Sequence, residues 1–543
     1  MTLQGKQMRF FTPFSGNLFV LRRHSSAPEM EALLANFFHL GAVEVFDCDI
    51  QCCDTFDWRL WRAGYHLQAV QEHQSFGLSL WRDANQVDTA DISGVMPRFA
   101  EQFAPGALRR RLRKLAGNRA LLPFLSVEGR QSCWQLRDED GSGVTLALIE
   151  AELEFARQGE ARRAAGNFLQ IVPLESCSAE FLRRVLTVCC SLQGVESLDG
   201  GLVGFGIEAL GMVPGDYQPW QAQRFDASME SAPCVRSILG QWVAVMGRNE
   251  HGMVHDLDAE FLHDYRVALR RLRSLLRSMG DVLDAEVVQS LRVDLAWLSS
   301  RTGLARDLDV FLESLEPLQR QLPPGSGEVL LSLKSLLWHK RRRAYGSLQR
   351  LLSSARYARV LDRLNSLVLR EDDQASLMTA AMADIPIKQL ADLCIGDALA
   401  RLLKKGGRIR AKSSDEQLHE VRIAAKRLRY LLDIFPSLYG GSGFERAVRA
   451  LKELQTCLGE FNDVAVQLQA LEEYAAQMYR SQAEGGYRLY MALGYLQALL
   501  HQRRSHCRGE FARQWKKFAD NRVQKHFSAM LGDILKKRDG EDT

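Results

Sequence analysis

The second half of this sequence contains an internal duplication. A segment that begins at Leu262 (LHDYRVALRRLRSLL) matches a segment that begins at Leu418 (LHEVRIAAKRLRYLL). A second pair follows, GLARD from Gly303 and GEFND from Gly459, and the offset is 156 residues in both pairs. Because two separate segments share one offset, the chain must fold into two similar copies of one structural unit.

Helical periodicity dominates the duplicated region. From Cys234 onward the chain reads as helices, separated at residues 323–327 (PPGSG), 370–374 (REDDQ) and 438–443 (LYGGSG). Each copy predicts roughly four helices, which is the size of one antiparallel bundle. The sequence therefore predicts an all-α domain over residues 234–530. Its parts are repeat one at about 234–370, repeat two at about 385–530, and a polar tail at 531–543.

The first 211 residues have a different pattern. Short alternating or apolar runs of strand length mix with a few amphipathic helices, and DEDGSG at 138–143 has the composition of a hairpin turn. An α+β domain with antiparallel strands is the expected fold. Residues 212–233, rich in Pro, Gly and polar side chains, are the predicted linker.

Charge is divided unevenly between these parts. Residues 1–230 hold 22 Lys and Arg against 28 Asp and Glu, whereas residues 231–543 hold 48 against 38. A basic helical half suggests an anionic partner, although a solvated basic surface is the commoner cause of such an excess.

Cysteine usage and hydropathy indicate the compartment. The 11 cysteines have no C-x-x-C spacing, which predicts neither a disulfide framework nor a zinc site. The N-terminus lacks an apolar run of signal-peptide length, and no uncharged run approaches the roughly 20 residues of a membrane span. We expect a cytoplasmic protein without a membrane partner.

A row of cations follows one face of each duplicated helix. At about 100° per residue, the cationic positions of the first copy fall within an arc of about 80°. The apolar residues lie in the neighbouring arc. The row in repeat one is His263, Arg266, Arg270, Arg273 and Arg277, and the row in repeat two is His419, Arg422, Lys426 and Arg429. Asp433 replaces the last arginine of the first row.

These rows lack the acidic residues that normally alternate with cations on a solvated helix. Each adjacent pair of like charges should cost a few tenths of a kcal/mol. A solvated basic face remains the ordinary alternative, but the row occurs in both copies and begins with a titratable histidine each time. Arg presents forked donors to phosphate oxygens and Lys a point charge, so a phosphate polyanion would compensate such a row.

The duplicated motif, HxxR[VI]xx[RK]RLR in both copies and followed about 40 residues later by Gly-x-x-[RN]-Asp, resembles the CHAD domain, the conserved-histidine α-helical domain. The resemblance covers about Cys234 to Phe527. It implies two pseudo-symmetric four-helix bundles with a basic groove that binds inorganic polyphosphate. It also implies that Asp307 and Asp463 orient neighbouring cations, and that eight residues of the two rows line this groove: His263, Arg266, Arg270, Arg273, His419, Arg422, Lys426 and Arg429. Arg277 is added to the predicted binding residues by its place in the row.

Other cations lie outside the two rows. Arg271 and Arg427 are adjacent to the rows, and further basic clusters occur along the helices, each of which is also compatible with an ordinary solvated face. The candidate rim residues are Arg271, Arg427, Arg306, Lys340, Arg341, Lys404, Lys405 and Arg408.

The N-terminal half resembles a degenerate CYTH domain, a triphosphate-tunnel β-barrel whose enzymes process triphosphates with a divalent metal. The similarity lies in DTFDWRLWRAGYHLQ from Asp54 and in the strands that follow Glu128. The family's opening ExExK strand, which holds metal and phosphate, corresponds here to NLFVLR at 17–22, without a carboxylate. Glu150, Glu152 and Glu154 alternate along one strand and could hold a cation, or could form an ordinary solvated face.

The sequence therefore predicts a non-catalytic polyphosphate-binding protein, associated with polyphosphate granules and without a cofactor. The alternative is an inorganic triphosphatase with a diverged CYTH site, which would need Mg²⁺ or Mn²⁺. Nucleic-acid binding is the third hypothesis, but the sequence has no zinc-finger or RNP-like pattern. A purely structural role, in which the rows bind nothing, predicts no effect of anions on stability. The oligomeric state is not predicted.

Overall fold

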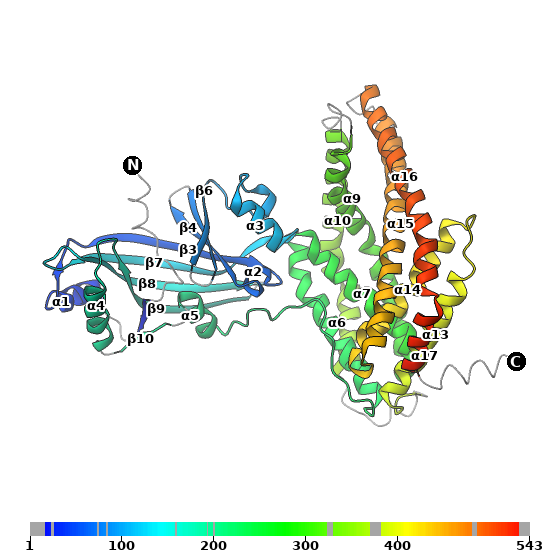
Figure 1. Cartoon of the computed structure of the whole chain (residues 1–543), viewed down its shortest axis with the longest axis horizontal. Helices are drawn as coiled ribbons and strands as arrows, with labels where there is room; N and C mark the ends of the chain where they lie inside the picture. The colour runs from blue at the N-terminus through cyan, green and yellow to red at the C-terminus, as the bar shows by residue number, and fades with distance from the viewer. Residues whose placement is uncertain are drawn as a thin grey trace. The chain divides into compact units, whose positions relative to one another are not determined.

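The chain divides into two compact units, Met1–Gln218 and Pro219–Thr543, and this division falls within the predicted linker. The computed structural model (Figure 1) describes residues 17–22, 26–72, 75–82, 85–157, 160–192, 194–198, 201–322, 330–369, 382–480 and 486–531. The breaks predicted at 323–327 and 370–374, and the tail from 532 onward, lie outside these residues. The exact domain limits stay predictions.

The first unit contains one ten-stranded antiparallel sheet with the order β10-β1-β9-β8-β7-β3-β4-β5-β6, and β2 pairs with one end of β7. The strands are β1 (Leu18–Leu21), β2 (His39–Leu40), β3 (Glu44–Thr55), β4 (Tyr65–Glu72), β5 (Ser75–Arg82), β6 (Asn85–Ser93), β7 (Leu121–Arg137), β8 (Gly143–Arg157), β9 (Glu160–Pro173) and β10 (Val195–Ser197).

This sheet is not a closed barrel, so the predicted barrel is wrong in that respect. Closure requires the first and last strands of the path to pair with each other. In the described part of the chain, β6 pairs only with β5, and the three-residue β10 pairs only with β1. The predicted antiparallel α+β fold is confirmed.

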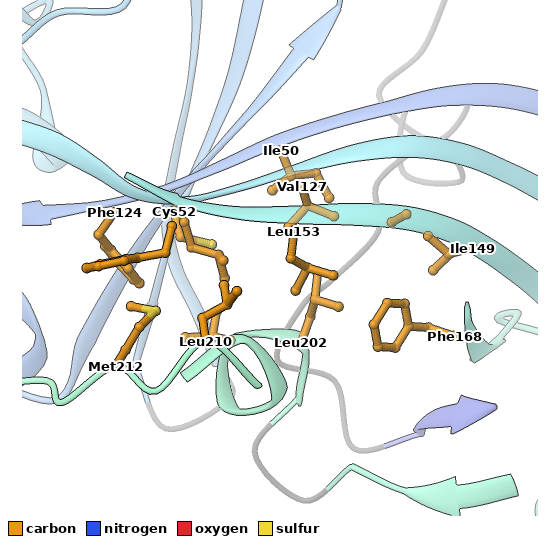
Figure 2. Packing of buried hydrophobic residues seen from close by; sticks show 14 of the residues in the cluster. Ile50, Cys52, Phe124, Val127, Ile149, Leu153, Phe168, Leu202, Leu210 and Met212 are labelled. Atoms are coloured by element: carbon orange, nitrogen blue, oxygen red, sulfur yellow. The ribbon is translucent and has the colours of Figure 1, made fainter. Parts of the chain in front are cut away.

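Helices cover the apolar faces of the sheet. They are α1 (Ala27–Leu34), α2 (Arg59–Arg62), α3 (Ala107–Ala116), α4 (Ala179–Ser191) and α5 (Gly201–Ala209), with a 3₁₀ turn η3 at Ala100–Gln102. Alternation along β8 places Ile149 and Leu153 in a core beneath α5, and Figure 2 shows Leu202 of α5 directed towards Leu153. The core beneath α1 and α4 includes Trp134, which is fully buried.

The second unit contains helices and no β-strand in its described residues, as predicted, apart from an isolated bridge between Glu230 and Pro386. Repeat one consists of α6 (Ser231–Val254), α7 (Ala259–Met279), α8 (Ala285–Arg301), α9 (Gly303–Gln319), α10 (Leu331–Leu352) and α11 (Ala355–Leu369), with a 3₁₀ turn η4 at Gly280–Val282. Repeat two consists of α13 (Ile387–Gly406), α14 (Asp415–Ile434), α15 (Ser442–Arg480), α16 (Gly486–Phe518) and α17 (Asn521–Leu531), with a 3₁₀ turn η6 at Pro436–Leu438. In the described residues, repeat one therefore has six α-helices and repeat two has five, more than the roughly four expected for each.

The helices that carry the two cationic rows begin at equivalent residues. The Asp258 side chain accepts hydrogen bonds from the first backbone N–H groups of α7, and Ser414, 156 residues later, caps α14 in a capping box with Gln417. These caps fix where each helix begins, so the two rows start at equivalent points. The apolar residues beside the rows are buried in both copies, so the predicted core faces are confirmed: Leu262, Tyr265, Leu269, Leu272 and Leu276 in α7, and Leu418, Val421, Ala425, Leu428 and Leu432 in α14.

The two repeats differ in the helix that carries the second motif. In repeat one, α8 ends and α9 begins around the fully buried Thr302, whereas in repeat two α15 continues through the equivalent position, Leu458. None of the helices in the described ranges is both long and apolar enough to cross a membrane.

Candidate anion-binding site

Helices α7 and α14 contact each other, which brings the two cationic rows together. Arg270 of α7 lies close enough to Arg422 and Lys426 of α14 to disfavour the charged form of both. Further along α7, the Ser278 hydroxyl accepts a hydrogen bond of 3.0 Å from Arg427 Nε. Cations that are 156 residues apart in the sequence therefore form a single cluster.

In each repeat, the second motif or the residues just before it contact the first motif. In repeat one, Arg266 Nη1 donates to the Ser299 carbonyl oxygen at 3.0 Å and to Thr302 Oγ1 at 2.7 Å. In repeat two, Arg422 Nη2 lies 4.0 Å from an oxygen of Asp463. The carboxylate after each motif glycine therefore lies beside the row: Asp463 contacts Arg422, and Asp307 favours the charged form of Arg266.

The histidine of repeat two contacts the residue before this carboxylate. His419 Nδ1 and Asn462 Oδ1 are 2.8 Å apart, a distance that fits a hydrogen bond from a protonated Nδ1. The equivalent of Asn462 in repeat one is Arg306, whose guanidinium lies 3.8 Å from Glu313. The two halves of the site are thus related by sequence but differ in detail around the histidines.

Burial and mutual repulsion act together on these cations. Burial, followed by the charges of Arg422 and Arg270, lowers the pKa of Lys426 to about 8. Burial also lowers the pKa of Arg266 and of Arg422, and Arg270 lowers both further. Positive charge is held here at a cost in free energy, which a bound anion would remove.

Several donor atoms in the cluster are buried without a hydrogen-bond partner. Among the described residues, the Nε atoms of Arg266, Arg270 and Arg422 have none, and neither has Nη1 of Arg306. A buried donor without a partner costs about 1–3 kcal/mol, more if charged. Arg270, Arg273, Arg277 and Lys426 also form no ion pair within the part of the chain that the structure describes. The cluster can therefore accept oxygen ligands from an anion.

Two cations predicted as rim residues lie instead between the two helices. The Arg271 guanidinium stacks 4.5 Å from the ring centre of Trp220 and 5.9 Å from that of Tyr430. Its repeat-two counterpart, Arg427, bonds across to Ser278. Each arginine thus reaches the opposite helix and holds the two repeats in register. Trp220 lies in the predicted linker, so no sequence pattern predicted this contact.

The remaining rim candidates fall into two groups. Arg341 is only 8% exposed, and its donors bond to Asp309 at 2.7 Å and Asp256 at 2.6 Å, which places its guanidinium within the helix packing. Lys405 is exposed but paired with Glu420 at 2.7 Å. Lys340 lies 4.5 Å from the ring of Tyr474. Lys404 and Arg408 are exposed.

The residues of the first unit that bear on metal binding lie in the opening strand and along β8. All four residues of β1 are buried and apolar, and the described residues contain no group of three His, Cys, Asp or Glu side chains placed to hold an ion. Glu150, Glu152 and Glu154 share one face of β8, where Glu150 lies opposite Arg130 and Glu154 pairs with Arg163 at 3.2 Å.

Comparison with known proteins identifies the helical unit. Residues 237–472, which include both cationic rows, match the family model of the CHAD domain. Two uncharacterized proteins of Mycobacterium tuberculosis, from strains CDC 1551 / Oshkosh and ATCC 25618 / H37Rv, are each 30% identical over 232 residues. This match covers 39% of the chain and 40% of each relative, so it spans less than half the length of these proteins.

Two solved structures are similar to part of this chain. The CHAD domain from the plant Ricinus communis is 28% identical, with a TM-score of 0.47, over 55% of this chain and 96% of that one. PptA from Streptomyces chartreusis is 20% identical, with a TM-score of 0.43, over 53% of this chain and all of that one. By the family match and the duplicated motif within it, the helical unit of this protein contains a CHAD domain.

Proposed function

We propose that this protein binds inorganic polyphosphate at the cluster formed by the rows of α7 and α14. The observation that carries the proposal is the meeting of Arg270 with Arg422 and Lys426, because like charges from two repeats converge where buried donors lack partners. Such an arrangement costs stability in the empty protein and is relieved only when an anion supplies oxygen acceptors.

The length of the cluster favours a chain of phosphates over a single phosphate ion. Cations extend from Arg266 to Arg277 along α7, about 16 Å at 1.5 Å per residue. A polymer with one negative charge on each phosphate can meet such a row continuously. A single ion would leave most of the row uncompensated.

Polyphosphate also fits this cluster better than nucleic acid does. Sequence-tolerant binding of single strands relies on aromatic rings that stack on bases. The rings beside the cations, Trp220 and Tyr430, are both occupied by the guanidinium of Arg271. A bare phosphate chain needs no such platform.

Titration with long-chain polyphosphate at fixed salt, with duplex DNA as competitor, tests the proposal. The variant Arg266→Ala/Arg270→Ala/Arg422→Ala/Lys426→Ala should lose binding while circular dichroism shows an intact fold. A matched control removes four exposed cations elsewhere in repeat two, Arg446, Arg449, Lys452 and Lys525, and should bind as the unmodified protein does.

Each outcome bears on a different part of the proposal. Equal losses in the test and control variants would show that binding follows net charge and not this site. Displacement by equimolar DNA would favour the nucleic-acid hypothesis. A flat titration of the unmodified protein would reject polyphosphate binding altogether.

We further propose that the protein acts without catalysis, in the cytoplasm and at polyphosphate granules, with the N-terminal unit as scaffold. The carboxylate-free β1 supports a non-catalytic role, because hard divalent cations need several oxygen ligands. Phosphate release from tripolyphosphate in the presence of Mg²⁺ or Mn²⁺ would restore the triphosphatase alternative. Co-localisation of a fluorescent fusion with granules tests the location.

A further inference from the structure

The last position of the cationic row has opposite charge in the two repeats. Arg277 of α7 and Asp433 of α14 are 156 residues apart and occupy equivalent positions. Arg277 is exposed and forms no ion pair among the described residues. Asp433 instead accepts a hydrogen bond from Arg429 Nε at 2.5 Å, one helical turn before it. The final turn therefore holds two unopposed cations in repeat one and a neutral pair in repeat two.

Burial does not explain this difference. The side chains of Arg429 and Asp433 are 23% and 22% exposed, so the pair is partly accessible, and Arg273, the equivalent of Arg429, is also only partly buried. Arg277 lowers the pKa of Arg273 further, after burial, whereas Arg429 is beside a carboxylate. Arg273 therefore lacks a counter-charge, whereas its equivalent Arg429 has one within its own helix.

Asp433 also acts on the opposite helix. Burial lowers the pKa of Arg271, and the charge of Asp433 acts in the opposite direction. Arg271 lies in α7 against Tyr430. The carboxylate thus lies among cations of both repeats, at the end of the cluster away from His419. A polyanion that continued along α14 past Lys426 would meet this negative charge.

We propose that the anion is held asymmetrically, by the full row of α7 and by the first part of the α14 row, with Asp433 as an internal counter-ion that keeps Arg429 from the ligand. This inference rests on the proposed function of the same cluster. It assigns Arg273 as a binding residue, Arg429 as a cation already neutralised, and Asp433 as the residue that limits affinity at this end.

Equivalent substitutions test the asymmetry. In polyphosphate titrations, Arg273→Ala should weaken binding by about tenfold and reduce the slope of log K against log salt by about one, as the loss of one phosphate contact does. Arg429→Ala alone would leave the Asp433 carboxylate uncompensated, so the matched change is Arg429→Ala/Asp433→Asn. It removes a neutral pair and should change affinity by less than about threefold and leave the salt slope unchanged.

Substitution of the counter-ion gives the complementary result. Asp433→Asn should tighten polyphosphate binding several-fold. In that background, Arg429→Ala should reduce the affinity about as much as Arg273→Ala reduces it in the unmodified protein. Asp433→Glu keeps the charge and should bind as the unmodified protein does. Thermal melts of every variant identify any that fails to fold.

Three results would overturn the inference. These are equal losses of affinity for Arg273→Ala and Arg429→Ala/Asp433→Asn, an Asp433→Asn variant that folds but binds no more tightly, and equal gains of affinity for Asp433→Asn and Asp433→Glu. If the unmodified protein binds no polyphosphate, the proposed function itself fails, and that result is distinguishable because it appears before any variant is compared.

Discussion

Arg266 donates a 2.7 Å hydrogen bond to the hydroxyl of Thr302, at the point where α8 ends and α9 begins. The acceptor is fully buried, and its hydroxyl lies 3.1 Å from the Leu298 carbonyl oxygen. The helix break of repeat one thus supplies a fixed partner for the first arginine of the row. In repeat two the continuous α15 has Leu458 at this position, and Arg422 relies on Asp463 instead.

Thr302→Val should loosen Arg266 without changing the shape of the core. Loss of the acceptor leaves a guanidinium nitrogen without one of its partners, which should cost about 1 kcal/mol of unfolding free energy. Polyphosphate affinity should fall a few-fold because the side chain is less well oriented. Urea denaturation and titration measure the two effects. Thr302→Ser retains the hydroxyl and should restore affinity, and a failure to do so would assign the effect to packing.

Binding should weaken as the pH rises through about 8, the pKa to which burial and the charges of Arg422 and Arg270 lower Lys426. Only the protonated amine attracts the anion, so the anion raises this pKa and binding takes up a proton. Titrations at pH 7 and pH 9 measure the effect. Lys426→Arg stays charged and should remove most of the dependence, whereas an unchanged profile in that variant would exclude Lys426 as its source.

The same amine makes a prediction for the protein without ligand. The unfolded chain holds the Lys426 proton up to an ordinary pKa of 10.5, whereas the folded chain releases it near 8. Between these values the unfolded state binds more protons, so the contribution of this group to stability increases with pH. Urea midpoints should therefore fall less steeply from pH 8 to pH 10 in the unmodified protein than in Lys426→Met.

Both cationic rows could be predicted from the sequence, because the 156-residue offset fixes their phase and the apolar residues beside them fix the buried face. The contacts of Arg341 could not, because its carboxylate partners come from other elements, Asp256 after α6 and Asp309 in α9. The open sheet could not be predicted either, because closure depends on strand pairing, to which β10 contributes only three residues. Local periodicity gives the face of a helix, but the partner of a side chain depends on the fold.

Arg341→Met should separate stability from binding. The substitution leaves Asp309, whose side chain is fully buried, without its cation, and breaking such a pair typically costs about 3–5 kcal/mol. Binding by the folded protein should be unchanged, because Arg341 lies within the helix packing and outside the cluster. Denaturant midpoints and polyphosphate titrations below the melting temperature measure each quantity. A loss of affinity without a loss of stability would instead indicate that Arg341 contacts the anion at the rim of the groove.

Arg270→Met should stabilise the empty protein while it weakens binding. Arg270 adds to the charge penalty on Lys426 and on Arg422, and its own Nε is buried without a partner. Methionine fills similar volume without charge, so we expect a gain of about 0.5–2 kcal/mol in the free energy of unfolding, as for other sites where function opposes stability.

Polyphosphate should make the unmodified protein more stable than Arg270→Met, which reverses the order of stability expected without ligand. At a ligand concentration 100 times the dissociation constant, binding adds about 2.7 kcal/mol to the unmodified protein, and Arg270→Met gains less because it binds more weakly. Melting temperatures with and without polyphosphate measure the crossover. Lower stability of Arg270→Met in the absence of ligand would mean that Arg270 contributes to packing, and that the repulsion between the two rows is not what the anion relieves.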